Sequence, residues 1–385
     1  MASTRAVYII AAKRTPFGSF GGSLKNTSAT ELAAEATRSA LSSLPPGTVG
    51  APDVDQIYVG NVVQTGSDAA YLARHVGLMC GTPVASPALT LNRLCGSGFE
   101  TVVQGADAIR LGRADVAVCA GTENMSSAPF VADGNSVRWG ATLGSALQLE
   151  DSLWAGLTDK LAGTPMGVTA ENLAEKYGIT RNECDEYAVR SQKAWAEAKL
   201  GGRFDLEMAP VEVKGKKGAT VTIDTDEHPR IVDPEKLAKL KPVFKKDGVV
   251  TAANASGICD GAGSIILASE ETVLKHNLTP LARVASYFTV GCDPTIMGIG
   301  PAPAIRGAVD IAGIHVCDAD RVEINEAFAA QYLACEKELR LDRNKTNING
   351  GAISIGHPLG ASGSRILAHL ANEYGRTEGN RWFIG

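Results

Sequence analysis

The sequence has few aromatic residues and no long hydrophobic run. Phe, Trp and Tyr make up 5% of its 385 residues. No apolar stretch approaches the roughly 20 residues that a helix needs to cross a bilayer, which argues against membrane insertion. The formal net charge is −5, and both signs are spread along the chain. A nucleic-acid partner is therefore disfavoured, because such proteins carry a dominant basic surface.

Paired cysteines are also absent. None of the eight cysteines forms a C-x-x-C pair of the kind that a zinc site usually needs, so we expect no metal. We predict free thiols in a reducing compartment. The cysteines lie at positions 80, 95, 119, 184, 259, 292, 317 and 335.

Glycine, by contrast, is abundant, with 42 residues, and 44% of the chain is apolar. Short β-rich runs alternate with helical patterns. Residues 6–12, 56–63 and 115–121 are typical of strands, and residues 29–41 of a helix. Strands that alternate with helices predict an α/β protein with a largely parallel sheet covered by helices.

We expect three segments. Residues 1–124 would form a first α/β half, completed by residues 247–278. Residues 125–246, where tryptophans and amphipathic helices enter, would form an inserted layer. Residues 279–385 would form a second half.

A glycine-rich turn that leads into an apolar helix occurs twice, at residues 92–112 and 347–375. The final residues NRWFIG then stand where DVAVCAG stands in the first half, as a following strand. This repeat of pattern predicts a duplicated α/β unit.

The segment NRLCGSGF places Cys95 one turn ahead of an apolar-periodic helix, with Gly96 and Gly98 beside it. The helix N-terminus favours a thiolate, so we predict a pKa below the usual value of about 8.5. The same amides could hold the negative oxygen of a thioester adduct. The alternative is a structural cysteine that ends a strand.

A nucleophilic thiol needs a base within reach. Of the six histidines, His357 alone lies in a comparable turn, GHPLGASGS, whereas His75 and His369 occupy helix-like positions. Asn325 and Glu326 lie at a strand-to-helix junction. Asn325 could cap the helix, or it could hold a water against a reacting carbonyl while Glu326 orients the groups behind it.

The segment MGIGPAPA has a G-x-G spacing, but Pro301 follows directly and Pro303 replaces the expected third glycine. A dinucleotide-binding fingerprint is therefore disfavoured.

These motifs together resemble those of the thiolases, over essentially the whole chain. They are NRLCGSGF around Cys95, NASGICDGAG from Asn254, NEAF from Asn325, and GGAISIGHPLGASGSR around His357. The resemblance implies an α/β thiolase fold, in which two duplicated βαβαβαββ halves form a layered α-β-α-β-α core with an inserted loop domain. It also implies that Cys95 carries an acyl group, that His357 activates Cys95, and that Asn325 holds a water.

The resemblance further implies that the substrates are coenzyme A and acyl-CoA, with no tightly bound cofactor. Coenzyme A would lie along the inserted layer, with Ser256 at the pantetheine and Arg230 near the nucleotide. The implied walls of its channel are Met166, Phe244 and Phe328. Lys214, Lys216 and Lys217 could attract its phosphates, although a lysine run is more often simply solvated.

The implied activity is reversible cleavage of 3-ketoacyl-CoA in β-oxidation. Cleavage of acetoacetyl-CoA is the alternative, although thiolases of that kind commonly carry a His where Pro165 stands. Decarboxylative condensation is disfavoured, because NEAF replaces an expected second histidine. We expect a homodimer or homotetramer that contacts its partners through the inserted layer.

We expect a mitochondrial location in the matrix, with the cytoplasm as second choice. The first 30 residues carry four basic residues and no acid, as targeting segments do. Residues 6–12 nevertheless have the pattern of a strand that belongs to the folded protein.

Thiolases carry a second cysteine, in a C-x-G motif beyond the last strand, that exchanges the proton of the nucleophilic carbon. This chain ends with NRWFIG at Gly385, before such a motif. Loss of a general acid or base costs about 10² to 10⁴ in rate. A catalytically impaired acyl-CoA-binding subunit is therefore a further alternative.

Overall fold

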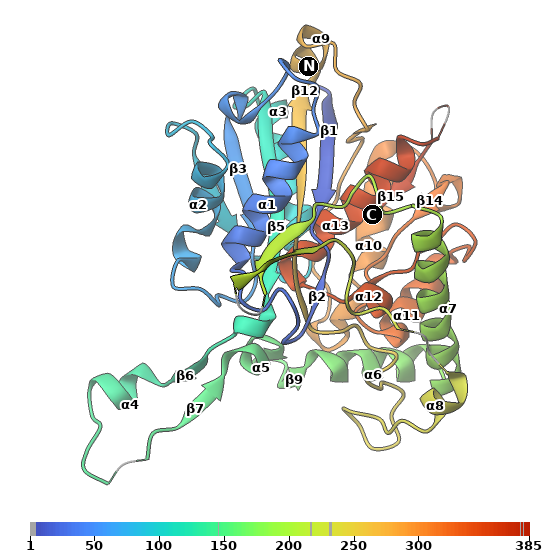
Figure 1. Cartoon of the computed structure of the whole chain (residues 1–385). Coiled ribbons are helices and arrows are strands. Elements are labelled where there is room, and N and C mark those ends of the chain that lie inside the picture. Colours follow the sequence, from blue (N-terminus) through green and yellow to red (C-terminus); the bar gives the residue numbers. More distant parts are fainter. Residues whose placement is uncertain (1–4, 145, 216–217, 231–232, 378, 380) are drawn as a thin grey trace.

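The computed structural model describes residues 5–144, 146–215, 218–230, 233–377, 379 and 381–385 (Figure 1). Lys216 and Lys217 lie outside these residues. Lys214 ends strand β10 (Val211–Lys214), which pairs with β11 (Thr220–Ile223), and it is exposed. Within the described residues, no helix has the length and apolar character needed to cross a bilayer.

A seven-stranded sheet forms the core of the first half. Its order is β13 (Ala282–Arg283), β1 (Val7–Arg14), β12 (Cys259–Ser269), β5 (Val116–Asn124), β3 (Gln56–Gly60) and β4 (Ala88–Leu91), and β2 (Gly18–Ser19) pairs with β12. The strands predicted within residues 6–12, 56–63 and 115–121 are confirmed.

The sheet is mixed, so the prediction of a largely parallel sheet is wrong. β3 is parallel to β4 and to β5, but β12 is antiparallel to both of its main neighbours, β1 and β5. The segment between β5 and β12 is long enough to return the chain in either direction. Alternation of strands and helices therefore did not determine the direction of β12.

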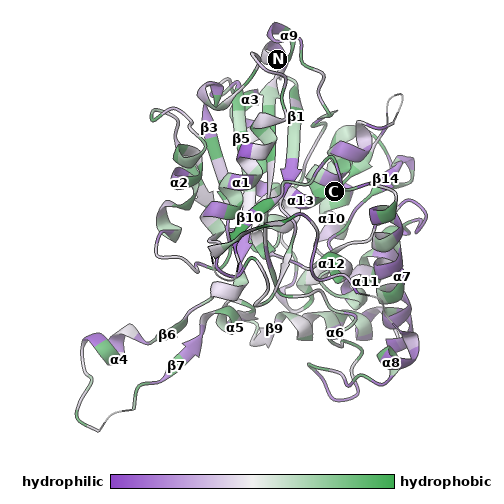
Figure 2. Ribbon diagram, in the orientation of Figure 1, coloured by the Kyte–Doolittle hydropathy of each residue, from purple (hydrophilic) through white to green (hydrophobic). Residues whose placement is uncertain are grey.

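Helices cover both faces of the sheet. α1 (Ala29–Ser42), predicted at residues 29–41, and α2 (Leu72–Met79) pack on one face. α3 (Ser97–Arg110) and α13 (Leu359–Tyr374) pack on the other. Successive side chains of a strand point to opposite faces, so Val118 of β5 meets the first pair of helices and Cys119 meets the second. Figure 2 shows the hydrophobic character of β1, β3 and β5.

A second core, formed by helices of the inserted layer and of the second half, is mainly helical. α6 (Met166–Tyr177), α7 (Arg181–Leu200), α10 (Pro301–Ala312) and α11 (Ala329–Leu339) enclose a separate core that includes Leu173, Tyr187, Ile305 and Tyr332. A parallel pair, β14 (Arg321–Val322) and β15 (Phe383–Ile384), lies beside it. The strand predicted in the final residues is thus confirmed as β15.

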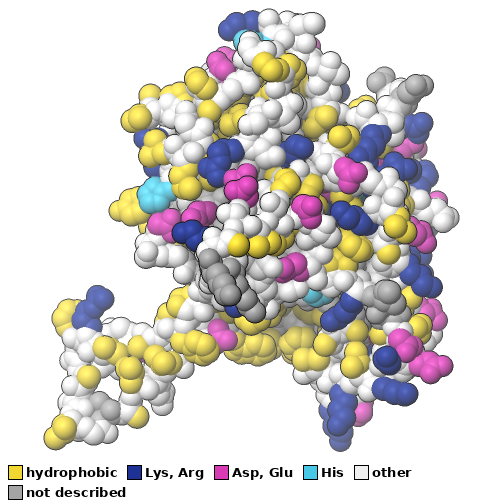
Figure 3. Space-filling view, viewed as in Figure 1, with side chains coloured by type: hydrophobic (Ala, Val, Ile, Leu, Met, Phe, Trp, Pro, Cys, Tyr) yellow, Lys and Arg dark blue, Asp and Glu magenta, His cyan; other side chains and the backbone are white. Residues whose placement is uncertain are grey.

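An arm formed by β6 (Phe130–Ala132), α4 (Gly134–Arg138) and β7 (Leu149–Asp151) projects from the body (Figure 1). Its exposed hydrophobic side chains, visible in Figure 3, include Trp139 and Leu147. The remaining elements are short: α5 (Ser152–Gly156), β8 (Thr158–Asp159), β9 (Thr164–Pro165), α8 (Pro234–Ala238), α9 (Glu270–Lys275) and α12 (Ala352–Ile355).

Candidate active site

The site forms where the N-termini of α3 and α13 meet, one helix from each half of the chain. Glycines allow the two helices to touch closely. A Cβ added to Gly98 of α3 would lie 2.3 Å from the Ser364 amide nitrogen, and one added to Gly363 of α13 would lie 2.3 Å from the Phe99 nitrogen. The residues just before each helix are thereby brought together.

Cys95 lies in the turn between β4 and α3. Leu94 before it adopts a left-handed backbone, with φ of 48°, which is uncommon for a residue other than glycine. The Ser97 side chain fixes the turn, since it accepts a hydrogen bond from the Arg93 amide at 2.8 Å and donates to the Leu94 carbonyl at 2.6 Å. The half-buried Cys95 is thus held in a defined orientation.

His357 enters the site from the loop before α13. Gly356 has a φ of 98°, and a Cβ there would lie 2.6 Å from the Cys259 sulfur. The His357 amide donates to the Gly257 carbonyl at 2.9 Å, which fixes the loop. In the buried ring, Nε2 lies 3.1 Å from the Cys95 sulfur, so the structure brings these two predicted residues together.

Asn325 adjoins the same imidazole. Its Nδ2 lies 3.3 Å from Nε2 of His357, whereas its buried Oδ1 has no hydrogen-bond partner among the described residues. Helix α11 begins at Ala329 with Phe328 at its cap position, so the alternative that Asn325 caps the helix is wrong.

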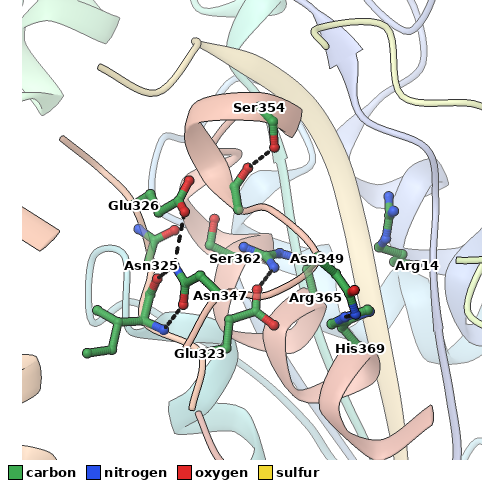
Figure 4. Close-up of polar contacts among 12 residues, drawn as sticks. Arg14, Glu323, Asn325, Glu326, Asn347, Asn349, Ser354, Ser362, Arg365 and His369 are labelled. Carbon is green, nitrogen blue, oxygen red and sulfur yellow. Dashed lines mark hydrogen bonds and ion pairs between the residues drawn. The ribbon is translucent and has the colours of Figure 1, made fainter. Parts of the chain in front are cut away.

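The buried Glu326 holds the loop that carries Asn325. Its carboxylate accepts from the Tyr187 and Ser191 hydroxyls at 2.7 Å each and from the Ile353 amide at 3.1 Å. Figure 4 shows Glu326 beside Asn325 and Asn347, whose amide also donates to Glu326, at 3.0 Å.

The electrostatics of the pair differ from the prediction. Burial raises the pKa of Cys95 to about 12, and Glu123 adds to the shift. The expectation of a pKa lowered by the helix is wrong, because burial outweighs the favourable backbone amides. Burial also lowers the pKa of His357 to about 3, with Arg365 contributing, so its imidazole is neutral at pH 7. The resting pair is therefore a thiol beside a neutral base.

The sequence alone did not point to Glu123. This buried residue at the end of β5 accepts from the Val62, Val63 and Gly360 amides at 3.1, 3.0 and 2.9 Å. It thereby ties the loop after β3 to the first turn of α13. Burial raises its pKa to about 7. A carboxylate at the end of so apolar a strand was the available signal.

Four of the five residues predicted to contact coenzyme A lie close to one another. The Ser256 hydroxyl donates to the Ala327 carbonyl at 2.9 Å, and the ring of Phe328 meets that of Phe244 edge-on at 6.2 Å. Phe244 also packs on Gly167, next to Met166, since a Cβ at Gly167 would lie 2.2 Å from its ring.

Arg230, the fifth, is exposed, and its guanidinium donates to the Ala252 carbonyl at 3.4 Å, at the start of the loop that leads to Ser256. Among the described residues, no group of three or more His, Cys, Asp or Glu side chains could hold a metal ion.

Comparison with known proteins identifies the family of the chain. Residues 7–271 match the family described as thiolase, N-terminal domain, and residues 278–382 match thiolase, C-terminal domain. The chain belongs to the thiolase family. It is 56% identical to the bovine (Bos taurus) protein named 3-ketoacyl-CoA thiolase, mitochondrial, over 100% of this chain and 96% of that one.

Other thiolases are similar over nearly the same length. The acetyl-CoA acetyltransferase of Pseudomonas aeruginosa is 46% identical over 97% of this chain and 94% of its own. The crystal structure of human mitochondrial 3-ketoacyl-CoA thiolase in complex with CoA matches with a TM-score of 0.92 at 56% identity, over 97% of this chain and 92% of that one. The predicted thiolase fold is confirmed. The proposed segment boundaries stay a prediction.

Proposed function

We propose that this thiolase is an acyltransferase that cleaves 3-ketoacyl-CoA with coenzyme A, and that the reaction is reversible. The mitochondrial relatives are named 3-ketoacyl-CoA thiolase. The observation that carries the proposal is the 3.1 Å contact between the Cys95 sulfur and Nε2 of a neutral His357. The higher identity to 3-ketoacyl-CoA thiolases than to the acetyltransferase favours this activity over acetoacetyl-CoA cleavage alone.

In this mechanism, His357 takes the proton of Cys95 as the sulfur attacks the 3-keto carbon. The thiol is protonated and the imidazole is neutral at rest, so proton transfer accompanies attack and does not precede it. The bond between C2 and C3 then breaks, and the acyl group stays on Cys95 as a thioester. The acetyl-CoA carbanion takes up a proton equivalent to the one that Cys95 lost and leaves as acetyl-CoA. Free coenzyme A then takes the acyl group, and His357 receives and returns its thiol proton.

The carbonyl oxygens need donors when they become negative. The amides at the start of α3, beside Cys95, are suited to one of them. Asn325, with an open Oδ1 and an Nδ2 next to His357, is suited to hold a water at the other. We propose that Ser256, Met166, Phe244 and Phe328 contact the pantetheine chain of the bound coenzyme.

The names of the relatives support a mitochondrial location, with the matrix as the compartment that we propose. The exposed hydrophobic side chains of the arm that β6, α4 and β7 form support assembly into a homodimer or homotetramer.

Mass spectrometry of the protein mixed with acetyl-CoA tests the proposed function. We expect one added acetyl group on the parent chain and none on Cys95→Ser. Cys119→Ser, which changes a buried cysteine of the sheet, is the matched control and should still be acetylated. Absence of the adduct on the parent chain would overturn the proposed function. Cleavage rates along a series of 3-ketoacyl-CoA lengths would then define the preferred substrate.

A further inference from the structure

The imidazole of His357 has a second polar contact, on the side away from Cys95. Its Nδ1 lies 2.6 Å from the hydroxyl oxygen of Ser362, a buried residue in the first turn of α13. The Ser362 hydroxyl also lies 3.1 Å from the carbonyl oxygen of Pro358. Figure 4 shows Ser362 in the same group of polar side chains as Asn325 and Arg365.

The chemistry of these three groups selects one arrangement of protons. A carbonyl oxygen only accepts, so the single Ser362 proton is directed to Pro358. The lone pair of the Ser362 oxygen then receives the N–H of Nδ1. A neutral imidazole with its proton on Nδ1 has a free lone pair on Nε2, and that lone pair faces the Cys95 sulfur.

The opposite arrangement would prevent the reaction. If the Ser362 hydroxyl donated to Nδ1, the ring proton would lie on Nε2, and that nitrogen could not take the proton of Cys95. Asn325 also contacts the ring, through its Nδ2, which lies near both ring nitrogens. This Nδ2 is a donor and cannot accept a hydrogen bond from Nδ1.

We propose that Ser362, supported by the Pro358 carbonyl, is a positioning residue that keeps His357 in the tautomer able to deprotonate Cys95. The Ser362 hydroxyl also accepts a hydrogen bond from Nδ1 after Nε2 has taken the proton of Cys95, because the imidazolium keeps the same Nδ1–H. The imidazolium is thus stabilised with no rearrangement of the site. This inference rests on the proposed roles of Cys95 and His357.

The test follows alkylation of Cys95 by iodoacetamide across pH, measured on the peptide that contains Cys95. In the parent chain, the thiolate and imidazolium form together without net proton uptake, so the rate should show a plateau near neutral pH. Ser362→Ala should lower that plateau about tenfold, as expected for one lost hydrogen bond to a charged group. The alkaline limb, where hydroxide removes the thiol proton, should not change.

Two control variants separate positioning from packing. Ser364→Ala removes a buried hydroxyl of the same helix that donates to the Ala361 carbonyl, and it should keep the parent profile. Ser362→Thr should restore the plateau, whereas Ser362→Val, which has the same shape without the hydroxyl, should not. The Thr and Val pair decides the question even if Ser362→Ala does not fold.

The outcomes distinguish this inference from the proposed function. The positioning role is overturned if Ser362→Val keeps the plateau rate of the parent chain. It is also overturned if the alkylation rate falls equally in the plateau and in the alkaline range. A selective loss of the plateau in a protein that acetyl-CoA fails to acetylate supports the positioning role and removes the proposed function. A further loss from Ser362→Ala on a His357→Asn background would also overturn it, because the hydroxyl would then act independently of the ring.

Discussion

Two buried histidines belong to the same part of the chain, yet their surroundings give them opposite properties. His357, just before α13, contacts a thiol, a hydroxyl and an amide, and burial lowers its pKa to about 3. His369, within α13, lies 2.6 Å from the Glu207 carboxylate. Burial would lower the pKa of His369 too, but Glu207 outweighs it and the pKa is raised.

The two histidines are both buried, so the difference between their pKa values comes from their hydrogen-bond and ion-pair partners. Glu207 also pairs with the buried Arg14 at 2.6 Å, and Arg14 pairs with Asp226 at 2.7 Å. This charged network is buried between β1, α13 and the segment that carries Glu207. A buried histidine without a carboxylate partner stays neutral and can accept a proton, whereas a carboxylate partner raises the pKa of a buried histidine.

The largest expected effect is on catalysis. His357→Asn should slow acetylation of Cys95 by about 10² to 10⁴, because the thiol loses its base. His369→Asn, in the same helix region, should leave the rate close to that of the parent. Time-resolved mass spectrometry after mixing with acetyl-CoA measures both. Equal losses in the two variants would remove the functional distinction between the histidines.

The next effect is on stability. Glu207→Gln leaves Arg14 and His369 without their shared carboxylate, and loss of one partner of a buried ion network costs about 3 to 5 kcal/mol. Glu336→Gln, which breaks a more exposed pair with Arg343 at 2.8 Å, should cost about 1 kcal/mol or less. Urea denaturation gives both free energies of unfolding. Similar values for the two variants would show that the buried network is not special.

The network should also make the protein sensitive to acid. Burial opposes ionisation of Glu207, but His369 and Arg14 lower its pKa to about 2. A lowered carboxyl pKa stabilises the fold above the unfolded value of about 4.3, and this contribution is lost as pH falls toward the folded value. We expect a loss of about 3 kcal/mol between pH 5 and pH 2. The loss should be much smaller in Glu207→Gln, and parallel curves would contradict its assignment to Glu207.

The smallest effect tests the backbone that presents His357. Gly356→Ala meets both an unfavourable left-handed φ and the Cys259 sulfur 2.6 Å from the new Cβ. Gly112→Ala has a φ of 68° but no atom within 4 Å of the new Cβ, so it isolates the backbone term of about 1 kcal/mol. Gly356→Ala should therefore lower the melting temperature more. An equal decrease in melting temperature for the two variants would show that the loop before His357 accommodates the new methyl group without strain.

These contrasts also show what the sequence could predict. The strands and helices with clear periods, such as β1, α1 and β5, were found, because period and burial are local properties. Cys95 and His357, which the structure brings into contact, could be singled out because each stands in a glycine-rich turn before an apolar helix. His75 and His369 lie on helices, as predicted.

Features that depend on distant partners were not predicted. The direction of β12 depends on a long connection, and the raised pKa of Cys95 depends on burial by other segments. Glu123 contacts amides of the loop after β3 and of α13, which are distant in sequence, and only its position at the end of an apolar strand marked it. Ser362 is local: it lies one helical turn beyond Pro358, and this position, which returns its side chain toward the His357 loop, was the signal available for it.

Nitrogen NMR of the histidine rings, assigned with His357→Asn and His369→Asn, tests the contrast most directly. At pH 6.5 we predict that His357 is neutral with its proton on Nδ1, and that His369 takes up its positive charge at a higher pH than His357 does. A charged His357, or a neutral ring with its proton on Nε2, would contradict the proposed role of His357 as the base that faces Cys95.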